Sequence, residues 1–389
     1  METSKRLQGI GEYYFSQKLR EIEQLNKAGK DIINLGIGSP DQAPHADVIK
    51  TLQEETAKTN VHGYQSYKGS PVLRKAISEW YAKWYSVELD PEKEILPLIG
   101  SKEGLMHVAM TYLGDDDAAL IPNPGYPTYQ SAVKLAGALP VSYELSGENN
   151  WQVNPGQLQE ILNKAEKKIK LLFVNYPHMP TGTNADYSTF ESLVAFAKAN
   201  QLLVIHDNPY SFILNEKPVS LLSVPGAKDC VIELNSLSKS HNLAGWRVGM
   251  LCGAAERIEE VLRFKSNMDS GMFLPVQLAA AKALSLGQDW FDRINATYQT
   301  RKQKALELLD LLDCTYADKQ SGLFVWAGVP GDLPDGYALS DKVLYGADVF
   351  ITPGGIFGTA GKKYIRVSLC ASVEKIEEAI QRIKNSNTL

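Results

Sequence analysis

The sequence lacks the features that mark a membrane protein or a nucleic-acid-binding protein. No segment approaches the roughly eighteen unbroken apolar residues that span a bilayer, and residues 1–30 are polar and charged where a signal peptide would have an apolar core. The formal net charge is -5, and no run of lysines and arginines offers a basic surface to a polyphosphate. We therefore expect a cytoplasmic protein with neither a membrane nor a nucleic acid among its partners.

Cysteine is also scarce. The four cysteines are scattered and form no CxxC pair. This arrangement argues against both a disulfide framework and a structural zinc site. We expect four buried thiols and no bound metal; the residues are Cys230, Cys252, Cys314 and Cys370.

Short apolar runs rich in β-branched residues alternate with helical patterns through the middle of the chain. Such alternation is typical of a largely parallel sheet covered by helices. Ser188 and Glu191 form a capping-box pattern that predicts the start of one of these helices, and therefore one β-α-β unit. The expected strands are Ala118–Ile121, Leu171–Val174, Leu202–Ile205, Val231–Leu234 and Val248–Cys252.

The length of 389 residues favours two packed lobes over one simple core. After about Met272 the pattern changes to a long amphipathic stretch through Leu312, and then to a tail rich in glycine and proline. We expect an N-terminal helix and arm at residues 1–47, a large α/β domain at 48–285 and a smaller α+β domain at 286–389.

Polar residues follow three of the expected strands, at the edge where open α/β sheets bind their ligands. They are Asn175, Asp207, Tyr210, Ser236, Ser238 and Lys239. A lone lysine is most often a surface charge. Here Gly245-Trp246-Arg247-Val248-Gly249 follows closely, so hydroxyls, an amine and a guanidinium come together around Lys239.

The pattern Ser-x-Ser-Lys at 236–239, followed by Gly-x-Arg-x-Gly at 245–249, resembles the lysine motif of the class I and II aminotransferases of pyridoxal 5'-phosphate (PLP) fold type I. The resemblance extends from about Asn34 to Arg366. It implies a three-layer α/β large domain with a mostly parallel sheet, and a smaller α+β domain with which the N-terminal arm associates. It also implies that PLP is the cofactor and that Lys239 carries it and moves the proton.

PLP acts as an electron sink, which requires a protonated ring nitrogen. The resemblance assigns the carboxylate of Asp207 to that nitrogen, Tyr210 to the 3'-oxygen of the cofactor, and Tyr126 to the face of the ring. Phosphate is suited to the planar fork of arginine and to the free N–H groups of a helix N-terminus. The residues implied for the phosphate are Ser101, Lys102 through its backbone or its side chain, Ser236, Ser238 and Arg247.

Tyr64 matches a family tyrosine that reaches the phosphate of the neighbouring subunit's cofactor. The resemblance therefore implies a homodimer with shared active sites. Tyr67 lies close enough in the sequence to be confused with Tyr64 in this role.

The implied substrates are an amino acid and a 2-oxo acid that react in a ping-pong sequence. Arg366 matches the arginine that binds the α-carboxylate, and Gly38 lies in the arm segment whose backbone closes over it. The motif sequences are most similar to those of the branch that contains the diaminopimelate and N-succinyl-diaminopimelate aminotransferases. Aspartate-type and alanine-type substrates are alternatives. The aromatic residues at 13–15 either cap the substrate pocket or pack against the arm.

One position departs from the family pattern. The family has an asparagine before Pro-Thr-Gly that donates to the 3'-oxygen, whereas this chain has Met179. A thioether cannot donate a hydrogen bond. Asn175 and His178 are the candidates to replace that donor, and the sequence does not decide which of them does so, or whether Tyr210 alone serves the 3'-oxygen.

Two other functions share these motifs. A PLP-dependent β-lyase that cleaves carbon–sulfur bonds has the same fold and nearly the same residues. A noncatalytic PLP-binding module of a transcriptional regulator retains the lysine motif, but such a module accompanies a DNA-binding domain and a basic face, which this sequence lacks.

Overall fold

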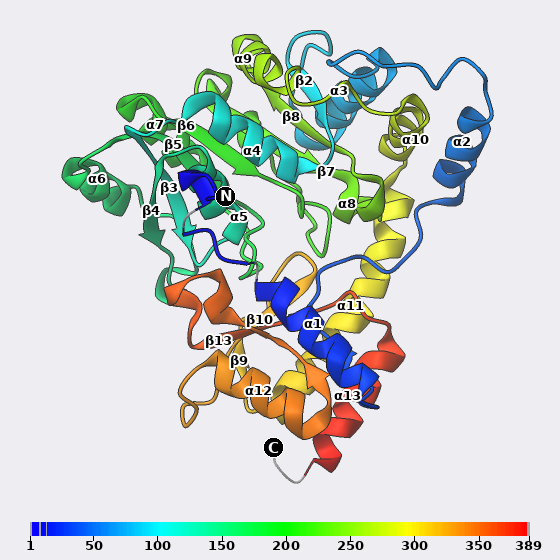
Figure 1. The fold of residues 1–389 in the computed structure, drawn as a ribbon, viewed down its shortest axis with the longest axis vertical. Helices are drawn as coiled ribbons and strands as arrows, with labels where there is room; N and C mark the ends of the chain where they lie inside the picture. The colour runs from blue at the N-terminus through cyan, green and yellow to red at the C-terminus, as the bar shows by residue number, and fades with distance from the viewer. Residues whose placement is uncertain (1, 8, 13, 387–389) are drawn as a thin grey trace.

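A seven-stranded sheet forms the centre of the upper, larger lobe in Figure 1. The computed structural model describes residues 2–7, 9–12 and 14–386. The strand order is β2-β8-β7-β6-β5-β3-β4, and all strands run parallel except β8, which is antiparallel to both neighbours. The strands are β2 (Ile95–Leu98), β3 (Asp117–Asn123), β4 (Leu139–Glu144), β5 (Lys168–Asn175), β6 (Leu203–Asp207), β7 (Val231–Ser236) and β8 (Gly249–Gly253).

Every strand that we expected from the sequence is confirmed, and β2 and β4 are additional. Pro97 interrupts the apolar run of β2, and β4 is an edge strand whose residues are mostly exposed or half-buried. Both features remove the continuous apolar signal on which the prediction depended.

Helices cover both faces of this sheet and make the three layers that we expected. Alternate residues of β3 point to opposite faces, so Ala119 and Ile121 belong to one core cluster and Ala118 and Leu120 to the other. The first face is covered by α4 (Ser101–Tyr112), α5 (Pro127–Leu135) and α9 (Ala255–Lys265). The second is covered by α3 (Pro71–Tyr85), α6 (Pro155–Lys164), α7 (Tyr187–Asn200) and α10 (Leu274–Leu284).

The β5-α7-β6 unit is present, but the capping box that predicted its helix is wrong. Helix α7 begins at Tyr187 with Asp186 as its N-cap, because the carbonyl of Asp186 already accepts from the backbone N–H of Thr189. Ser188 therefore lies inside the first turn, where it cannot cap the helix.

The lower lobe in Figure 1 contains a four-stranded antiparallel sheet in the order β12-β13-β10-β9. The amphipathic stretch expected after Met272 forms two helices instead of one. The first, α10, ends at Leu284, and Gly287 is the N-cap of the second, α11. The strands are β9 (Thr315–Tyr316), β10 (Phe324–Gly328), β12 (Thr352–Pro353) and β13 (Tyr364–Ser368), and the helices are α11 (Gln288–Leu311), α12 (Gly336–Ala347) and α13 (Val373–Asn385).

The N-terminal segment packs on this lower lobe. Ile22 of α1 (Tyr14–Lys27) and Ile32 share a buried cluster with Leu344 and Phe350. Strand β1 (Ile33–Asn34) pairs in parallel with β11 (Val349–Phe350). These contacts support our proposal that residues 1–47 associate with the C-terminal domain, although residues 1, 8 and 13 lie outside the described part of the chain.

Two short helices complete the framework, α2 (Ala46–Thr56) and α8 (Leu237–Ser240). Among the described residues, no helix is long and apolar enough to cross a membrane. All four cysteines are free thiols, but Cys370 is only half-buried, so the expectation that all four are buried is wrong at that position.

Candidate active site

A cavity of about 340 Å³ lies between the carboxyl ends of β5, β6 and β7 and the lower lobe. The end of each of these strands contributes a lining residue, as does the start of α4, and β10 and β13 close the cavity from below. Every residue that we predicted for the site lines this cavity, except Tyr64. Those residues are Gly38, Ser101, Lys102, Tyr126, Asn175, Asp207, Tyr210, Ser236, Ser238, Lys239, Arg247 and Arg366.

Lys239 lies on α8, which begins directly after β7. The side chain of Ser236 caps this helix by accepting from the backbone N–H of Ser238 at 3.2 Å. The Nζ of Lys239 donates to the carbonyl of Gly38 at 2.7 Å, so the arm and the lysine meet at the cavity. Burial lowers the pKa of Lys239, and the positive charges of Arg366 and Arg247 act in the same direction. A lysine with a lowered pKa has more of its amine in the nucleophilic neutral form.

Asp207 ends β6 and is buried. Its Oδ2 accepts from the hydroxyl of Tyr129 at 2.8 Å, whereas its buried Oδ1 has no hydrogen-bond partner among the described residues. Burial raises the pKa of Asp207 to about 6, against the hydrogen bond from Tyr129. A buried carboxylate oxygen without a donor fits a protonated ring nitrogen, which would supply both the missing hydrogen bond and a compensating charge.

The turn before α4 contacts Arg247, which also lines the cavity. Gly100 has a φ of 81°, and a Cβ at that position would lie 2.1 Å from Nη2 of Arg247. Glycine is therefore required there for the backbone to approach the guanidinium. Arg247 Nη1 donates to Ser238 Oγ at 3.4 Å, and Ser236 Oγ donates to the same oxygen at 2.9 Å. Hydroxyls, a guanidinium and the N-terminus of a 12-residue helix fit a phosphate group.

Two tyrosines, Tyr126 and Tyr210, also line the cavity. Tyr126 precedes α5 and packs edge-on against Tyr129, with 5.7 Å between the ring centroids. Tyr210 lies edge-on to Phe324 at 6.2 Å, and burial raises the pKa of its hydroxyl. Tyr210 therefore keeps its proton and can donate it in a hydrogen bond.

Arg366 lies on β13 in the lower lobe and is buried. Its Nη2 donates to the carbonyl of Gly36 at 2.8 Å. Three aromatic rings surround the guanidinium, whose Cζ lies 3.7 Å from the centroid of Phe324, 4.6 Å from that of Phe357 and 5.6 Å from that of Phe15. A buried guanidinium held in this way is suited to binding a carboxylate in a fixed orientation.

The arm is close to both of these cations. A Cβ on Gly38 would lie 2.1 Å from the ring of Phe324, so only glycine lets the arm pass at this point. The carbonyl oxygens of Gly36 and Gly38 accept from Arg366 and Lys239 respectively. Asp41, a little further along, forms a two-pronged ion pair with Arg301 of α11 at 2.7 and 2.8 Å, which anchors the arm.

Met179 occupies the place of the expected asparagine and lines the cavity. Its sulfur lies 3.3 Å from Nη1 of Arg366, as an acceptor. His178 does not line the cavity, and its Nδ1 pairs with Thr181 Oγ1 at 2.8 Å, which argues against it as the replacement donor. Asn175 does line the cavity, but its amide donates to the carbonyl of Asp207 at 2.6 Å and accepts from the backbone of Met179 at 2.7 Å.

Tyr64 is 94% exposed and lies outside the cavity of its own chain. Tyr67, the alternative for its role, is 46% exposed and does not line the cavity either. Within a single chain, neither tyrosine contributes to the site.

Several cavity residues were not predicted as site residues. Tyr129 was visible one helical turn after Tyr126, but nothing in the sequence pointed it toward Asp207. Phe15 was considered only as a cap or as packing, and it does line the cavity. Tyr14 lines no part of it, and Tyr13 lies outside the described residues. The other apolar wall residues are Leu19, Ile37, Pro209, Ala244, Phe324 and Phe357.

Comparisons with known proteins agree with this geometry. The family model described as aminotransferase class I and II matches residues 30–383. An LL-diaminopimelate aminotransferase of Dehalococcoides mccartyi is 40% identical over 98% of both chains, and that of Halothermothrix orenii is 38% identical over 100% of this chain and 99% of its own.

Solved structures show the same similarity. The substrate-bound BacF structure from Bacillus subtilis has a TM-score of 0.90 and 32% identity, covering 99% of this chain and 97% of that one. A probable N-succinyldiaminopimelate aminotransferase from Thermus thermophilus has a TM-score of 0.87 and 30% identity, covering 95% of this chain and 99% of that one.

Proposed function

The chain belongs to the class I and II aminotransferases, and on that basis we propose that it transfers the amino group of LL-diaminopimelate to a 2-oxo acid. The observation that supports this donor is the full-length similarity to relatives that are LL-diaminopimelate aminotransferases, at 40% and 38% identity. Family membership confirms the sequence resemblance, PLP fold type I and PLP as the cofactor. It favours the aminotransferase over the lyase and the regulatory module.

Bound PLP supplies an electron sink for the electrons left on the substrate when its Cα proton is removed. The residues that fit its parts are Lys239 at the aldehyde, Asp207 at the ring nitrogen, Tyr210 at the 3'-oxygen, Tyr126 at the ring face, and Arg247 with Ser101, Lys102, Ser236 and Ser238 at the phosphate.

Side chains from both lobes have roles in the reaction. Nζ of Lys239, with its lowered pKa, takes the proton from the substrate Cα as a general base. Asp207, whose buried Oδ1 has no hydrogen-bond partner among the described residues, would stabilise a positive charge on the ring nitrogen. Arg366 would bind and orient the α-carboxylate from the lower lobe, in the cavity that Lys239 also lines. Because one cavity serves the amino acid and the 2-oxo acid in turn, ping-pong kinetics follow.

The lining of the cavity favours a second candidate donor. Phe15, Leu19 and Ile37 form an apolar wall together with the rings around Arg366. Among the described lining residues, Asp207 is the only carboxylate, and it faces the ring nitrogen in our assignment. The distal ammonium of diaminopimelate therefore has no anionic partner among them, whereas an aromatic or apolar side chain would bury against this wall.

A panel of ¹⁵N-labelled amino acids separates these possibilities. The purified enzyme with PLP is given LL-diaminopimelate, L-phenylalanine, L-aspartate or L-alanine together with 2-oxoglutarate, and labelled glutamate is quantified. We expect the highest kcat/KM for LL-diaminopimelate, and a higher value for L-phenylalanine would favour the second candidate. Transfer from none of them, or ammonia release without labelled glutamate, would contradict the proposed function.

We further propose that the enzyme is a cytoplasmic homodimer in which Tyr64 completes the partner's site. The support for the dimer is the family resemblance together with the 94% exposure of Tyr64. A tyrosine with a functional role and no role in its own chain's cavity is expected to be covered by a second subunit. The four free thiols support a reducing compartment.

Subunit complementation tests this arrangement. Tyr64→Ala and Lys239→Ala proteins are unfolded together and refolded, and activity is compared with that of each protein alone. In a mixed dimer, one site combines the native Lys239 of one subunit with the native Tyr64 of the other. Recovered activity is therefore expected, together with a mass near twice 42.9 kDa by light scattering. Activity no higher than the sum of the separate proteins would contradict the shared site.

A further inference from the structure

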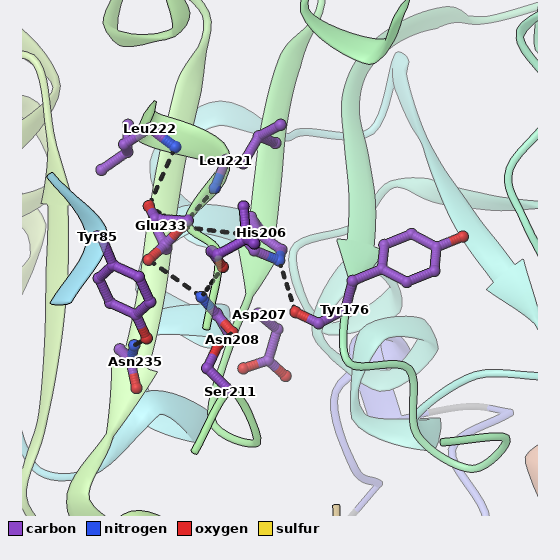
Figure 2. Close-up of polar contacts among 12 residues, drawn as sticks. Tyr85, Tyr176, His206, Asp207, Asn208, Ser211, Leu221, Leu222, Glu233 and Asn235 are labelled. Atoms are coloured by element: carbon purple, nitrogen blue, oxygen red, sulfur yellow. Dashed lines mark hydrogen bonds and ion pairs between the residues drawn. The ribbon is translucent and has the colours of Figure 1, made fainter. Parts of the chain in front are cut away.

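A buried ionisable pair lies beside Asp207 and has no part in the mechanism above. Glu233 on β7 and His206 on β6 are register partners on adjacent parallel strands, and both are 0% exposed. Nδ1 of His206 lies 2.8 Å from Oε2 of Glu233. Figure 2 shows the imidazole between Glu233 and the backbone of Tyr176, with Asp207 next along the strand.

Hydrogen-bond donors surround Glu233 on both carboxylate oxygens. Oε2 accepts from Ser220 Oγ at 2.7 Å and from the backbone N–H of Leu221 at 3.1 Å. Oε1 accepts from the hydroxyl of Tyr81 at 2.9 Å and from the amide of Asn208 at 3.3 Å. Donors on both oxygens favour the ionised form of a carboxyl group.

The partners of His206 define its protonation state. Nε2 lies 3.0 Å from the carbonyl oxygen of Tyr176, which can only accept, so Nε2 carries a proton. Nδ1 faces a carboxylate oxygen of Glu233, so an N–H at Nδ1 suits this geometry as well. The arrangement fits an imidazolium, in agreement with the rule that a buried charge has a partner of opposite charge.

Glu233 also fixes the chain on both sides of Asp207. His206 precedes Asp207 and Asn208 follows it, and Glu233 is hydrogen-bonded to both. The backbone N–H of Asn208 donates to the carbonyl of Leu234 at 2.8 Å, which ties the same segment to β7 a second time. The position of the Asp207 backbone is therefore set by the strand that leads to Lys239.

We propose that the Glu233–His206 ion pair is a positioning element of the active site, which holds the backbone around Asp207 and keeps the Asp207 carboxylate ionised by placing a lasting positive charge beside it. The proposal depends on the proposed function only in taking Asp207 as the partner of the cofactor's ring nitrogen. Burial raises the pKa of Asp207 to about 6, and the hydrogen bond from Tyr129 and the charge of His206 oppose that rise. Loss of the imidazolium charge would let Asp207 take up a proton at a higher pH.

The surrounding titratable groups do not replace this charge. Those that face the pair are Tyr81, Tyr85 and Cys252, with the ion-paired Glu94 and Lys228 beyond them. Those around Asp207 are Tyr126, Tyr129, Tyr210 and Lys239. Burial raises the pKa of Tyr81, Tyr85 and Cys252, so these groups are neutral near pH 7. Lys239 also lowers the pKa of Asp207, but the charge of His206 has the larger effect.

Nitrogen NMR of the full-length holoenzyme, labelled with ¹⁵N in its histidine rings and without substrate, tests the charge directly. We expect one histidine with both ring nitrogens protonated from pH 6 to pH 9. Burial lowers the pKa of His178 and His241 to about 3, so those rings stay neutral over that range. Loss of the signal in His206→Gln assigns it. If that variant does not fold, His107→Gln removes the other carboxylate-bonded histidine and assigns the signal by elimination. A neutral His206 ring would overturn the proposal.

Glu233→Gln tests the positioning role through cofactor affinity rather than turnover. We expect the pH at which PLP affinity falls on the acid side of its profile, the acid limb, to be about one unit higher than in the wild type. This corresponds to about ten-fold weaker binding on the acid limb, with a smaller difference toward pH 9. The matched control is Tyr143→Phe on the edge strand β4 of the same sheet, which removes an equally buried hydrogen bond to the Phe173 carbonyl. It should lower stability without moving the limb.

Equal PLP-binding profiles in Glu233→Gln and Tyr143→Phe would mean that the pair is merely structural, and would overturn the proposal. If Glu233→Gln does not fold, the NMR measurement on the wild-type protein still decides the charge of His206. Both measurements omit the amino donor, so their outcome is independent of whether LL-diaminopimelate is the substrate.

Discussion

At Asp207, the requirements of folding and of cofactor binding oppose each other. The pKa of about 6 lies above the ordinary value of 3.8, because burial penalises the charged form. A carboxyl group whose pKa is raised by folding contributes most to stability below its unfolded pKa, and that contribution is lost as the pH rises through about 6. Above pH 6 the ionised Asp207 therefore destabilises the folded, cofactor-free protein, and a bound pyridinium would offset this destabilisation.

We predict that Asp207→Asn stabilises the cofactor-free protein at pH 8 and weakens PLP binding. A shift of about two pKa units corresponds to about 3 kcal/mol in the free energy of unfolding, as an upper estimate. Urea denaturation at several pH values measures the first effect, and PLP titration the second. The gain in stability should shrink as the pH falls toward 5. A variant that is less stable than the wild type at pH 8 would show that Asp207 is satisfied without the cofactor.

Arg366 provides a test of substrate binding that leaves the cofactor unchanged. We predict that Arg366→Lys raises KM for both substrates about a hundred-fold, because lysine cannot make two parallel hydrogen bonds to a carboxylate and such bonds contribute about 1.5–3 kcal/mol each. Steady-state kinetics measure KM, and PLP titration checks that cofactor affinity is retained.

Arg74→Lys is the control for the loss of a buried guanidinium. Arg74 and Arg366 are both 4% exposed, but Arg74 binds Glu92 and the carbonyl of Gly69, away from the cavity. Its KM values should equal those of the wild type even if its stability falls. An unchanged KM in Arg366→Lys would remove Arg366 from the site.

At the scale of residues, the sequence predicted which side chains meet in the cavity best where polar residues are concentrated in short motifs. The end of β6 and the start of α8 carry Asp207 and Lys239 in patterns that point to their roles, and the structure brings both to one cavity. Tyr129 and Phe324 were not predicted, because their place in the cavity depends on packing between segments far apart in the chain. At Met179 the sequence showed that a donor was missing, but not that Arg366 would contact the sulfur.

At the scale of elements, the backbone conformation at the start of α4 and its close approach to Arg247 both require glycine at position 100. We predict that Gly100→Ala weakens PLP binding by at least ten-fold, because the new Cβ would lie 2.1 Å from Arg247 Nη2 and the φ of 81° is unfavourable for alanine. PLP titration measures the effect. Gly331→Ala is the control, since a Cβ there meets nothing within 4 Å and its φ is not positive. Equal affinities in the two variants would argue against this turn as the phosphate site.

The strands of the central sheet could be predicted because their apolar runs are continuous, whereas element boundaries depend on local backbone contacts. Helix α7 begins at Tyr187 because the carbonyl of Asp186 already accepts helical hydrogen bonds. The break between α10 and α11 at Gly287 was hidden within one amphipathic pattern. Both cases show that periodicity locates an element better than it locates its ends.

At the scale of the whole molecule, the site is assembled from both lobes. The upper lobe contributes Lys239 and Asp207, the lower lobe contributes Arg366, and the arm contacts two of these three through the carbonyls of Gly36 and Gly38. This arrangement could be predicted only through the family resemblance, because no local pattern places the end of the chain against its middle. It also explains how Arg366 and Lys239, from different lobes, come to line one cavity.

The central claim is that Lys239 performs amino transfer in this cavity, and its most direct test is the half-reaction without an acceptor. Absorbance between 300 and 500 nm is recorded for the wild-type and Lys239→Ala proteins loaded with PLP, before and after LL-diaminopimelate is added. We expect the wild type to convert one equivalent of cofactor to its amino form and to release one equivalent of 2-oxo acid, while Lys239→Ala retains PLP noncovalently and converts almost none. Equal conversion by the two proteins would contradict the role of Lys239.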